Sequence, residues 1–108
     1  MRKIAIFVLA LGSLWATQAA AADTAQVSAT KNVGIVNFAF KPGTLTVPKG
    51  TKVEFENESN TAHTTTSKNF DSKRIAPGKS FMVRFQQRGT FAYHCKIHPF
   101  MKGKIVVQ

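Results

Sequence analysis

The sequence predicts an all-β protein, a small sandwich of about eight short strands. β-branched and aromatic residues recur between closely spaced turn signals along most of the chain, which is typical of strands. Several of these segments alternate apolar and polar residues with a period of two, as expected for strands with one buried face. No segment keeps a helical period of apolar residues. Many short strands with frequent turns indicate an antiparallel sandwich or barrel.

The first 22 residues are predicted to be a signal peptide rather than part of the fold. Arg2 and Lys3 give it a positive start, an apolar run follows, and Ala19–Ala22 offers the small residues that a signal peptidase reads. The apolar run is too short to cross a bilayer, which needs about 20 residues, so an uncleaved membrane anchor is the less favoured alternative. Cleavage after Ala22 would leave one domain, residues 23–108, exported to the periplasm.

The expected strands follow one another from Val33 to the C-terminus. In chain order the segments are 33–40, 44–47, 52–56, a short β-branched stretch at 63–67, 80–85, 90–95 and 103–107. Turns with proline and glycine separate many of them, at 41–43, 48–50 and 76–79. The alternation is clearest at 52–56, where Val53 and Phe55 are expected to point into the core. In 90–95, Tyr93 and Cys95 share one face of the strand.

The chain is strongly basic, with 15 Lys and Arg against 5 acidic residues and a net charge of +10. Such a charge favours an acidic partner surface and speeds the encounter with it. Nucleic acid is the usual partner of a basic chain, but here the lysines are scattered singly, without a basic helix or a stacking motif. We therefore expect a monomer with an acidic protein partner, no nucleic acid, and no stable membrane insertion after cleavage.

Cys95 is the only cysteine, and it begins a cluster of residues that can bind a metal. An unpaired cysteine in an exported protein is either a buried inert thiol or a metal thiolate. Cys95, His98 and Met101 place a thiol, an imidazole and a thioether within seven consecutive residues. His63, where a polar loop meets a strand, can supply a second imidazole. These four donors are the set of a blue-copper site. Zinc, which accepts the same three strong ligands, is an alternative.

His94 adjoins Cys95 but is not expected to bind the metal. Successive side chains of a strand point to opposite faces, so His94 lies away from the face that carries Cys95.

Three motifs carry a resemblance to a known family. They are Tyr93-His94-Cys95, His98-Pro99-Phe100-Met101 and Gly103-Lys104-Ile105-Val106-Val107. With them the sequence resembles the cupredoxins, the small type I copper proteins, and its Cys-x2-His-x2-Met spacing is similar to that of their amicyanin-like branch. The resemblance implies a Greek-key sandwich with one copper ion, Cu(II) or Cu(I), near one end. It implies His63, Cys95 and His98 as equatorial ligands and Met101 as the axial ligand.

One position departs from the family pattern. Many relatives have asparagine just after the first histidine, where this chain has Thr64. A hydroxyl can make fewer hydrogen bonds between the two ligand segments than an amide can. The backbone N–H of Thr64 can still serve the sulfur of Cys95. We therefore expect copper binding to persist, with the two segments less firmly tied.

The donor set and the resemblance predict a one-electron carrier with a mononuclear type I copper site. Four protein ligands leave no open position for a substrate, which argues against an enzyme. His98 is the expected exit for the electron, and Pro99 and Phe100 beside it would form an apolar docking spot. Lys96 and Lys102 would give that spot a basic rim. The alternatives are a copper-handling protein, such as a chaperone or resistance factor, and a structural sandwich with an inert cysteine.

Overall fold

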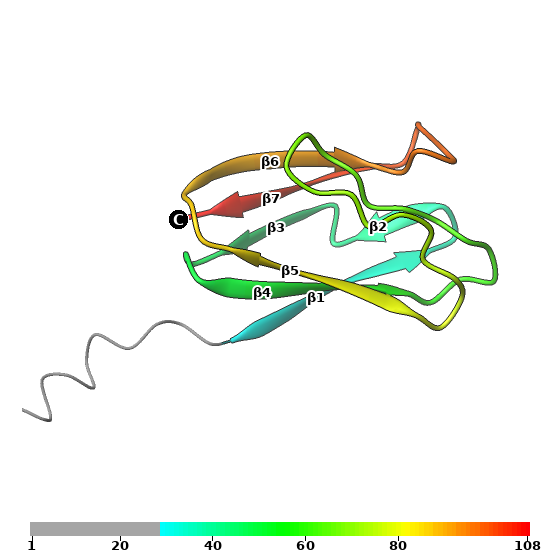
Figure 1. Ribbon diagram of the computed structural model, residues 1–108, viewed down its shortest axis with the longest axis horizontal. Coiled ribbons are helices and arrows are strands. Elements are labelled where there is room, and N and C mark those ends of the chain that lie inside the picture. Colours follow the sequence, from blue (N-terminus) through cyan, green and yellow to red (C-terminus); the bar gives the residue numbers. More distant parts are fainter. Residues whose placement is uncertain (1–28) are drawn as a thin grey trace, which may run out of the picture.

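The structure, a computed structural model, describes residues 29–108 as two β-sheets packed face to face (Figure 1). It confirms the predicted all-β sandwich. The predicted signal peptide, residues 1–22, lies outside the described residues. The described part contains seven strands, which are β1 Thr30–Val36, β2 Ala39–Lys41, β3 Thr44–Val47, β4 Thr51–Asn57, β5 Ser80–Phe85, β6 Gly89–His94 and β7 Lys102–Val107.

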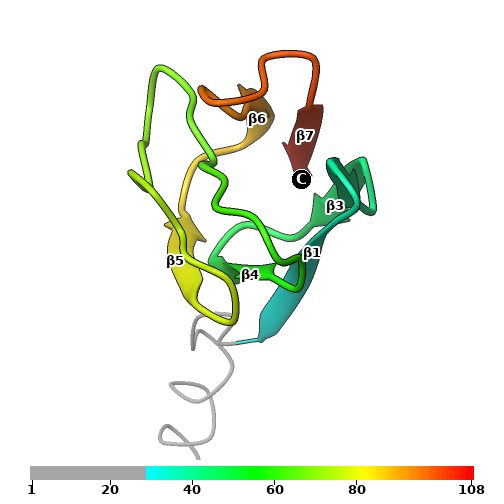
Figure 2. The same cartoon turned by 90° about the vertical axis from the view of Figure 1, so that its right-hand side faces the viewer.

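The two sheets are mixed rather than antiparallel. One has the strand order β2-β1-β4-β5 and the other β3-β7-β6, and Figure 2 shows the two layers from the end. β1 pairs with β4 and β3 pairs with β7 in parallel, whereas the other pairs are antiparallel. The expectation of an antiparallel sandwich is therefore wrong for these two pairs. Between β1 and β4 the chain passes through β3, which belongs to the opposite sheet. No hairpin therefore joins β1 to β4, and the two strands can pair in parallel; the same holds for β3 and β7.

The segment 33–40, expected to be one strand, contains a tight hairpin. Val36 at the end of β1 pairs with Ala39 at the start of β2, so only Asn37 and Phe38 form the turn. Both have a positive φ, 42° and 60°, which is the sign that a two-residue type I′ turn requires at both positions. The turn could not be recognised in the sequence, because phenylalanine is not a typical turn residue.

The stretch 63–67, expected to be a short strand, forms only isolated bridges. His63 pairs with Ile75, and Thr66 pairs with both Asp71 and His94. These residues belong to the long connection 58–79 between β4 and β5, which reaches the second sheet at His94. Within residues 29–108 there are thus seven strands where about eight were expected.

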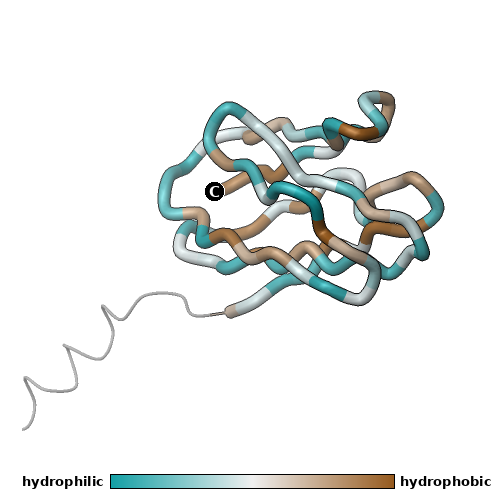
Figure 3. The backbone as a smooth tube through the Cα atoms, turned by 45° about the vertical axis from the view of Figure 1, so that its right-hand side comes forward, coloured by the Kyte–Doolittle hydropathy of each residue, from teal (hydrophilic) through white to brown (hydrophobic). Residues whose placement is uncertain are grey.

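The core lies between the two sheets, where their apolar faces meet. Val53 and Phe55 on β4 are fully buried, as the alternation predicts, and Tyr93 and Cys95 are buried as well. Figure 3 shows apolar and polar stretches alternating along the chain. The Tyr93 ring lies so close to Gly103 that a Cβ added there would come within 2.5 Å of it. A side chain at position 103 would therefore displace the core tyrosine.

Two segments that are far apart in the sequence lie at the same end of the sandwich. The β1–β2 turn and the loop after β6 are both at the end opposite the C-terminus (Figure 1). The connection 58–79 also reaches this region, because Thr66 pairs with His94. Residues 29–108 include no helix with the length and apolar character needed to cross a membrane.

Candidate metal centre

His63 is held in the interior by the connection that follows β4. The backbone N–H of His63 donates to the Ile75 carbonyl at 3.2 Å, and the His63 carbonyl accepts from the backbone N–H of Ile75 at 2.7 Å. The buried amide of Asn57 shapes the loop before it, donating to the carbonyls of Thr61 and Ile75 at 2.8 Å each. The Asn57 oxygen accepts from the N–H of Ser59 at 3.0 Å. Asn57, the last residue of β4, therefore supports a fully buried histidine.

The loop 95–101 folds back tightly after β6. The Cys95 N–H donates to the Met101 carbonyl at 3.1 Å, and the Met101 N–H donates to the His98 carbonyl at 2.9 Å. Cys95 and Met101 are buried and His98 is half-buried. Two backbone hydrogen bonds thus hold three of the sequence-predicted residues in one short loop.

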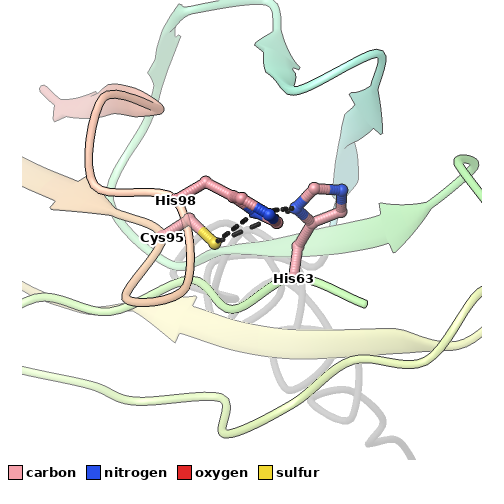
Figure 4. Close-up of side chains that lie close together, drawn as sticks. All are labelled: His63, Cys95 and His98. Atoms are coloured by element: carbon pink, nitrogen blue, oxygen red, sulfur yellow. Dashed lines mark hydrogen bonds between the residues drawn. The ribbon is translucent and has the colours of Figure 1, made fainter. Parts of the chain in front are cut away.

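His63, Cys95 and His98 form a compact cluster (Figure 4). The Cys95 Sγ lies 3.9 Å from the His63 Nδ1 and 3.8 Å from the His98 Nδ1, and the two Nδ1 atoms are 3.2 Å apart. A metal about 2.0 Å from each nitrogen and about 2.3 Å from the sulfur, the bond lengths that zinc forms in proteins, fits within this triangle. Two imidazole nitrogens and one sulfur converge here, and a single metal ion would bind all three. One thiolate and two imidazoles fit copper.

The protein environment favours the metal-binding form of His63. Desolvation by burial, and then the neighbouring charge of His98, lower the pKa of His63 below its ordinary 6.5. A lowered pKa keeps the imidazole neutral, which is the form that binds a metal. The His63 Nε2 is buried without a partner among the described residues, although a ligating histidine usually donates this N–H. His63 lines a hollow of about 340 Å³ beside Glu58 and Thr61, which has room for a bridging water.

Thr64 ties the two ligand segments together. Its N–H donates to the Cys95 Sγ at 3.3 Å, as the sequence led us to expect. Its Oγ1 accepts the N–H of Lys96 at 2.8 Å and lies 3.0 Å from the Thr66 Oγ1. The hydroxyl that replaces the amide of many relatives therefore still connects the two segments directly. Hydrogen bonds to a coordinating sulfur also tune a copper site.

Lys96 forms an ion pair with Asp71 across the same two segments. Its Nζ lies 2.9 Å from the Asp71 carboxylate. The hydrogen bond from Lys96, followed by that from the Lys73 N–H, lowers the pKa of Asp71 to about 2. Lys96 was expected to be part of a basic rim, but Asp71 balances its charge. The pair instead fastens the connection 58–79 to the loop 95–101.

Phe38 covers the two imidazoles from the β1–β2 turn. Its ring centroid lies 5.6 Å from that of His63 and 5.0 Å from that of His98, with interplanar angles of 85° and 84°. Phe38 is 46% exposed, and Phe100, 6.5 Å away, is 71% exposed. Sequence reasoning missed Phe38 because its turn lay hidden within an expected strand.

The other two predicted positions also lie at this end of the sandwich. His94 stands apart from the cluster and lines a hollow of about 770 Å³ on the outer face of β6 and β7, together with Pro99 and Lys102. This agrees with the period-two expectation for β6. Met101 is 2% exposed at the close of the loop 95–101, where it remains the candidate for an axial ligand.

The chain matches the family model of the cupredoxin-like domain over residues 3–107. It belongs to the cupredoxin-like family. Among its relatives, amicyanin-alpha of Methylorubrum extorquens is 29% identical over 107 residues, which cover 93% of this cupredoxin and 85% of that protein. Plastocyanin of Rumex obtusifolius is 30% identical over 87 residues, which cover 65% of this chain and 88% of that protein.

Solved structures agree with this family and with the fold. The Cu(I) form of an amicyanin mutant superimposes with a TM-score of 0.69 at 26% sequence identity, covering 81% of this chain and 89% of that one. The resemblance to cupredoxins found in the sequence is thus confirmed, as is the β-sandwich. The cluster of His63, Cys95 and His98 has the arrangement of a copper site.

Proposed function

We propose that this cupredoxin is a blue copper protein that carries single electrons through one copper ion held by His63, Cys95, His98 and Met101. The observation that carries the proposal is the triangle of one sulfur and two Nδ1 atoms, separated by 3.2 to 3.9 Å. A thiolate and two imidazoles, with a weak methionine, are the donors of electron-transfer copper. Bound copper would supply a one-electron redox couple, Cu(II)/Cu(I).

The chain's own residues support a carrier of electrons rather than a carrier of copper or an enzyme. His63 and Cys95 are fully buried, whereas a protein that hands copper on needs donors that another protein can reach. Asn57 and Thr64 fix the two ligand segments through hydrogen bonds at 2.8 Å. Donors fixed in this way move little when the charge of the metal changes. Four protein donors also leave no position for a substrate.

We further propose that the protein is exported through residues 1–22, acts in the periplasm as a monomer, and docks onto an acidic redox partner. Exposed Pro99 and Phe100 adjoin His98 at the metal end. Of the four described acidic residues, Glu54 and Glu56 lie on β4, Glu58 lines the hollow beside His63, and Asp71 is paired with Lys96. The strands β3, β6 and β7 carry no acidic residue but contain Lys102 and Lys104. Electron transfer to an acidic partner should therefore slow as salt rises, because charges are screened beyond about 10 Å at 0.1 M ionic strength.

The experiment that tests the proposed function is a copper titration of the purified protein and of Cys95→Ser. The wild-type protein should gain an intense thiolate-to-copper absorption band that saturates at one equivalent and disappears reversibly on reduction. Cys95→Ser should stay folded and show no such band. A protein that binds zinc but gives no band with Cu(II), or a band that persists in Cys95→Ser, would contradict the proposal.

A further inference from the structure

The β1–β2 turn contains a residue that its backbone disfavours. Asn37 and Phe38 are the whole loop of a two-residue hairpin, and both have a positive φ. Such turns favour Asn-Gly, because glycine adopts a positive φ without a steric penalty. Asn37 satisfies this preference, but Phe38, with a φ of 60°, is bulky and belongs to the residues that rarely adopt it.

Neither the turn nor the core explains the choice of phenylalanine at this position. The side chain is 46% exposed and is not part of the buried core cluster. A residue that its backbone conformation disfavours, and that does not improve the packing of the core, is expected at functional sites. The strain persists there because the surroundings require it. The contacts of Phe38 should therefore show what the residue is for.

Those contacts lead to the metal cluster. Phe38 meets the rings of His63 and His98 in edge-to-face geometry, with centroids 5.6 Å and 5.0 Å away. The two imidazoles come from different segments, and their own centroids lie 5.0 Å apart. A single phenyl ring thus touches both. Since His63 is fully buried and Phe38 is half-exposed, the phenyl ring covers the imidazole pair against solvent.

We propose that Phe38 is a positioning residue that clamps the imidazoles of His63 and His98 together and closes the copper position, at the cost of strain in its own turn. The inference rests on the proposed function and names a determinant of the same site. The clamp acts mainly on His98, because His63 is already fixed by two backbone hydrogen bonds to Ile75. Without the phenyl ring, His98 can swing outward and release the metal.

The strained turn provides a test that separates this role from a structural one. Phe38→Gly gives the turn an Asn-Gly pair, so the metal-free variant should unfold at the same temperature as the wild type or at a higher one. The same variant, loaded and reduced, should lose copper to a Cu(I) chelator faster by about 10-fold or more, as for other residues that orient metal ligands. Phe38→Tyr, which keeps the ring, should lose copper at nearly the wild-type rate.

Met82→Ala is the matched control, because Met82 is also 46% exposed but lies on β5, outside the metal cluster. Its copper loss should equal that of the wild type. Equal rates of copper loss from Phe38→Gly and from the wild type would overturn the clamp. So would an unfolding temperature of metal-free Phe38→Gly below that of the metal-free wild type. If the wild type gave no blue band at all, the proposed function would fail separately. The ring contacts would then be tested in the metal-free protein, by nuclear Overhauser effects between Phe38 and both histidines.

Discussion

His63 and His98 present the same ring nitrogen to the site from two different kinds of support. His63 is fully buried, and its backbone is bonded to Ile75 in both directions. His98 is half-buried in a short loop, where its carbonyl accepts one hydrogen bond from Met101 and its ring is covered by Phe38. The comparison teaches that the fold itself fixes one imidazole, whereas local contacts fix the other. Damage to the first support should cost stability, and damage to the second should mainly loosen the metal.

The largest effect is expected from Asn57→Ala, which removes the support of the His63 side. The variant loses the amide that donates to the carbonyls of Thr61 and Ile75 at 2.8 Å each, and it loses the oxygen that accepts from the N–H of Ser59 at 3.0 Å. We expect the free energy of unfolding of the metal-free protein to fall by about 3 kcal/mol, measured by urea denaturation. The exposed Asn69 provides the control, since Asn69→Ala should change this free energy by less than about 0.5 kcal/mol. Equal effects of the two substitutions would show that Asn57 is no support.

An intermediate effect is expected from Thr64→Val, which acts on the hydrogen bonds between the segment that carries His63 and the loop that carries His98. Valine keeps the shape and the backbone N–H to the Cys95 sulfur, but it removes the hydroxyl that accepts from Lys96. We expect a loss of about 1 kcal/mol of unfolding free energy, with the energy of the blue band nearly unchanged. Thr90→Val, at an exposed position of β6, is the matched control. A large shift of the band in Thr64→Val would show that the hydroxyl, not the N–H, governs the sulfur.

The sequence was sufficient to predict the sandwich and to name three residues that the structure brings together, His63, Cys95 and His98, and the reason is largely local. Met101 as a fourth ligand stays a prediction. The alternation at Val53 and Phe55 depends only on the period of a strand, and the loop from Cys95 to Met101 holds three soft donors in one short stretch. The turn at Phe38 could not be predicted, because the residue contradicts the preference of its own backbone. Asn57 was missed for a related reason: an asparagine beside serine and glutamate resembles a surface loop until its long-range bond to Ile75 is known.

The smallest effect is expected from Asp71→Asn, which removes the ion pair between the connection 58–79 and the loop 95–101. The pKa of Asp71 is lowered from 3.8 to about 2 by Lys96, so its contribution to stability is present above pH 3.8 and is lost as pH falls towards 2. The unfolding temperature of the wild type should therefore exceed that of Asp71→Asn slightly at neutral pH. The difference should shrink as acid is added. A difference that does not change with pH would mean that the ion pair with Lys96 does not stabilise the fold.

The most direct test of the metal centre compares the two histidines that flank Cys95 in the sequence. His98 belongs to the cluster, whereas His94 lines a hollow on the outer face of β6 and β7. The measurement is the absorption spectrum of the Cu(II)-loaded variants His98→Ala and His94→Ala. We predict that His94→Ala keeps the wild-type band and that His98→Ala lacks it. The opposite pattern, or a wild-type band in both variants, would contradict the assignment of copper to His63, Cys95 and His98.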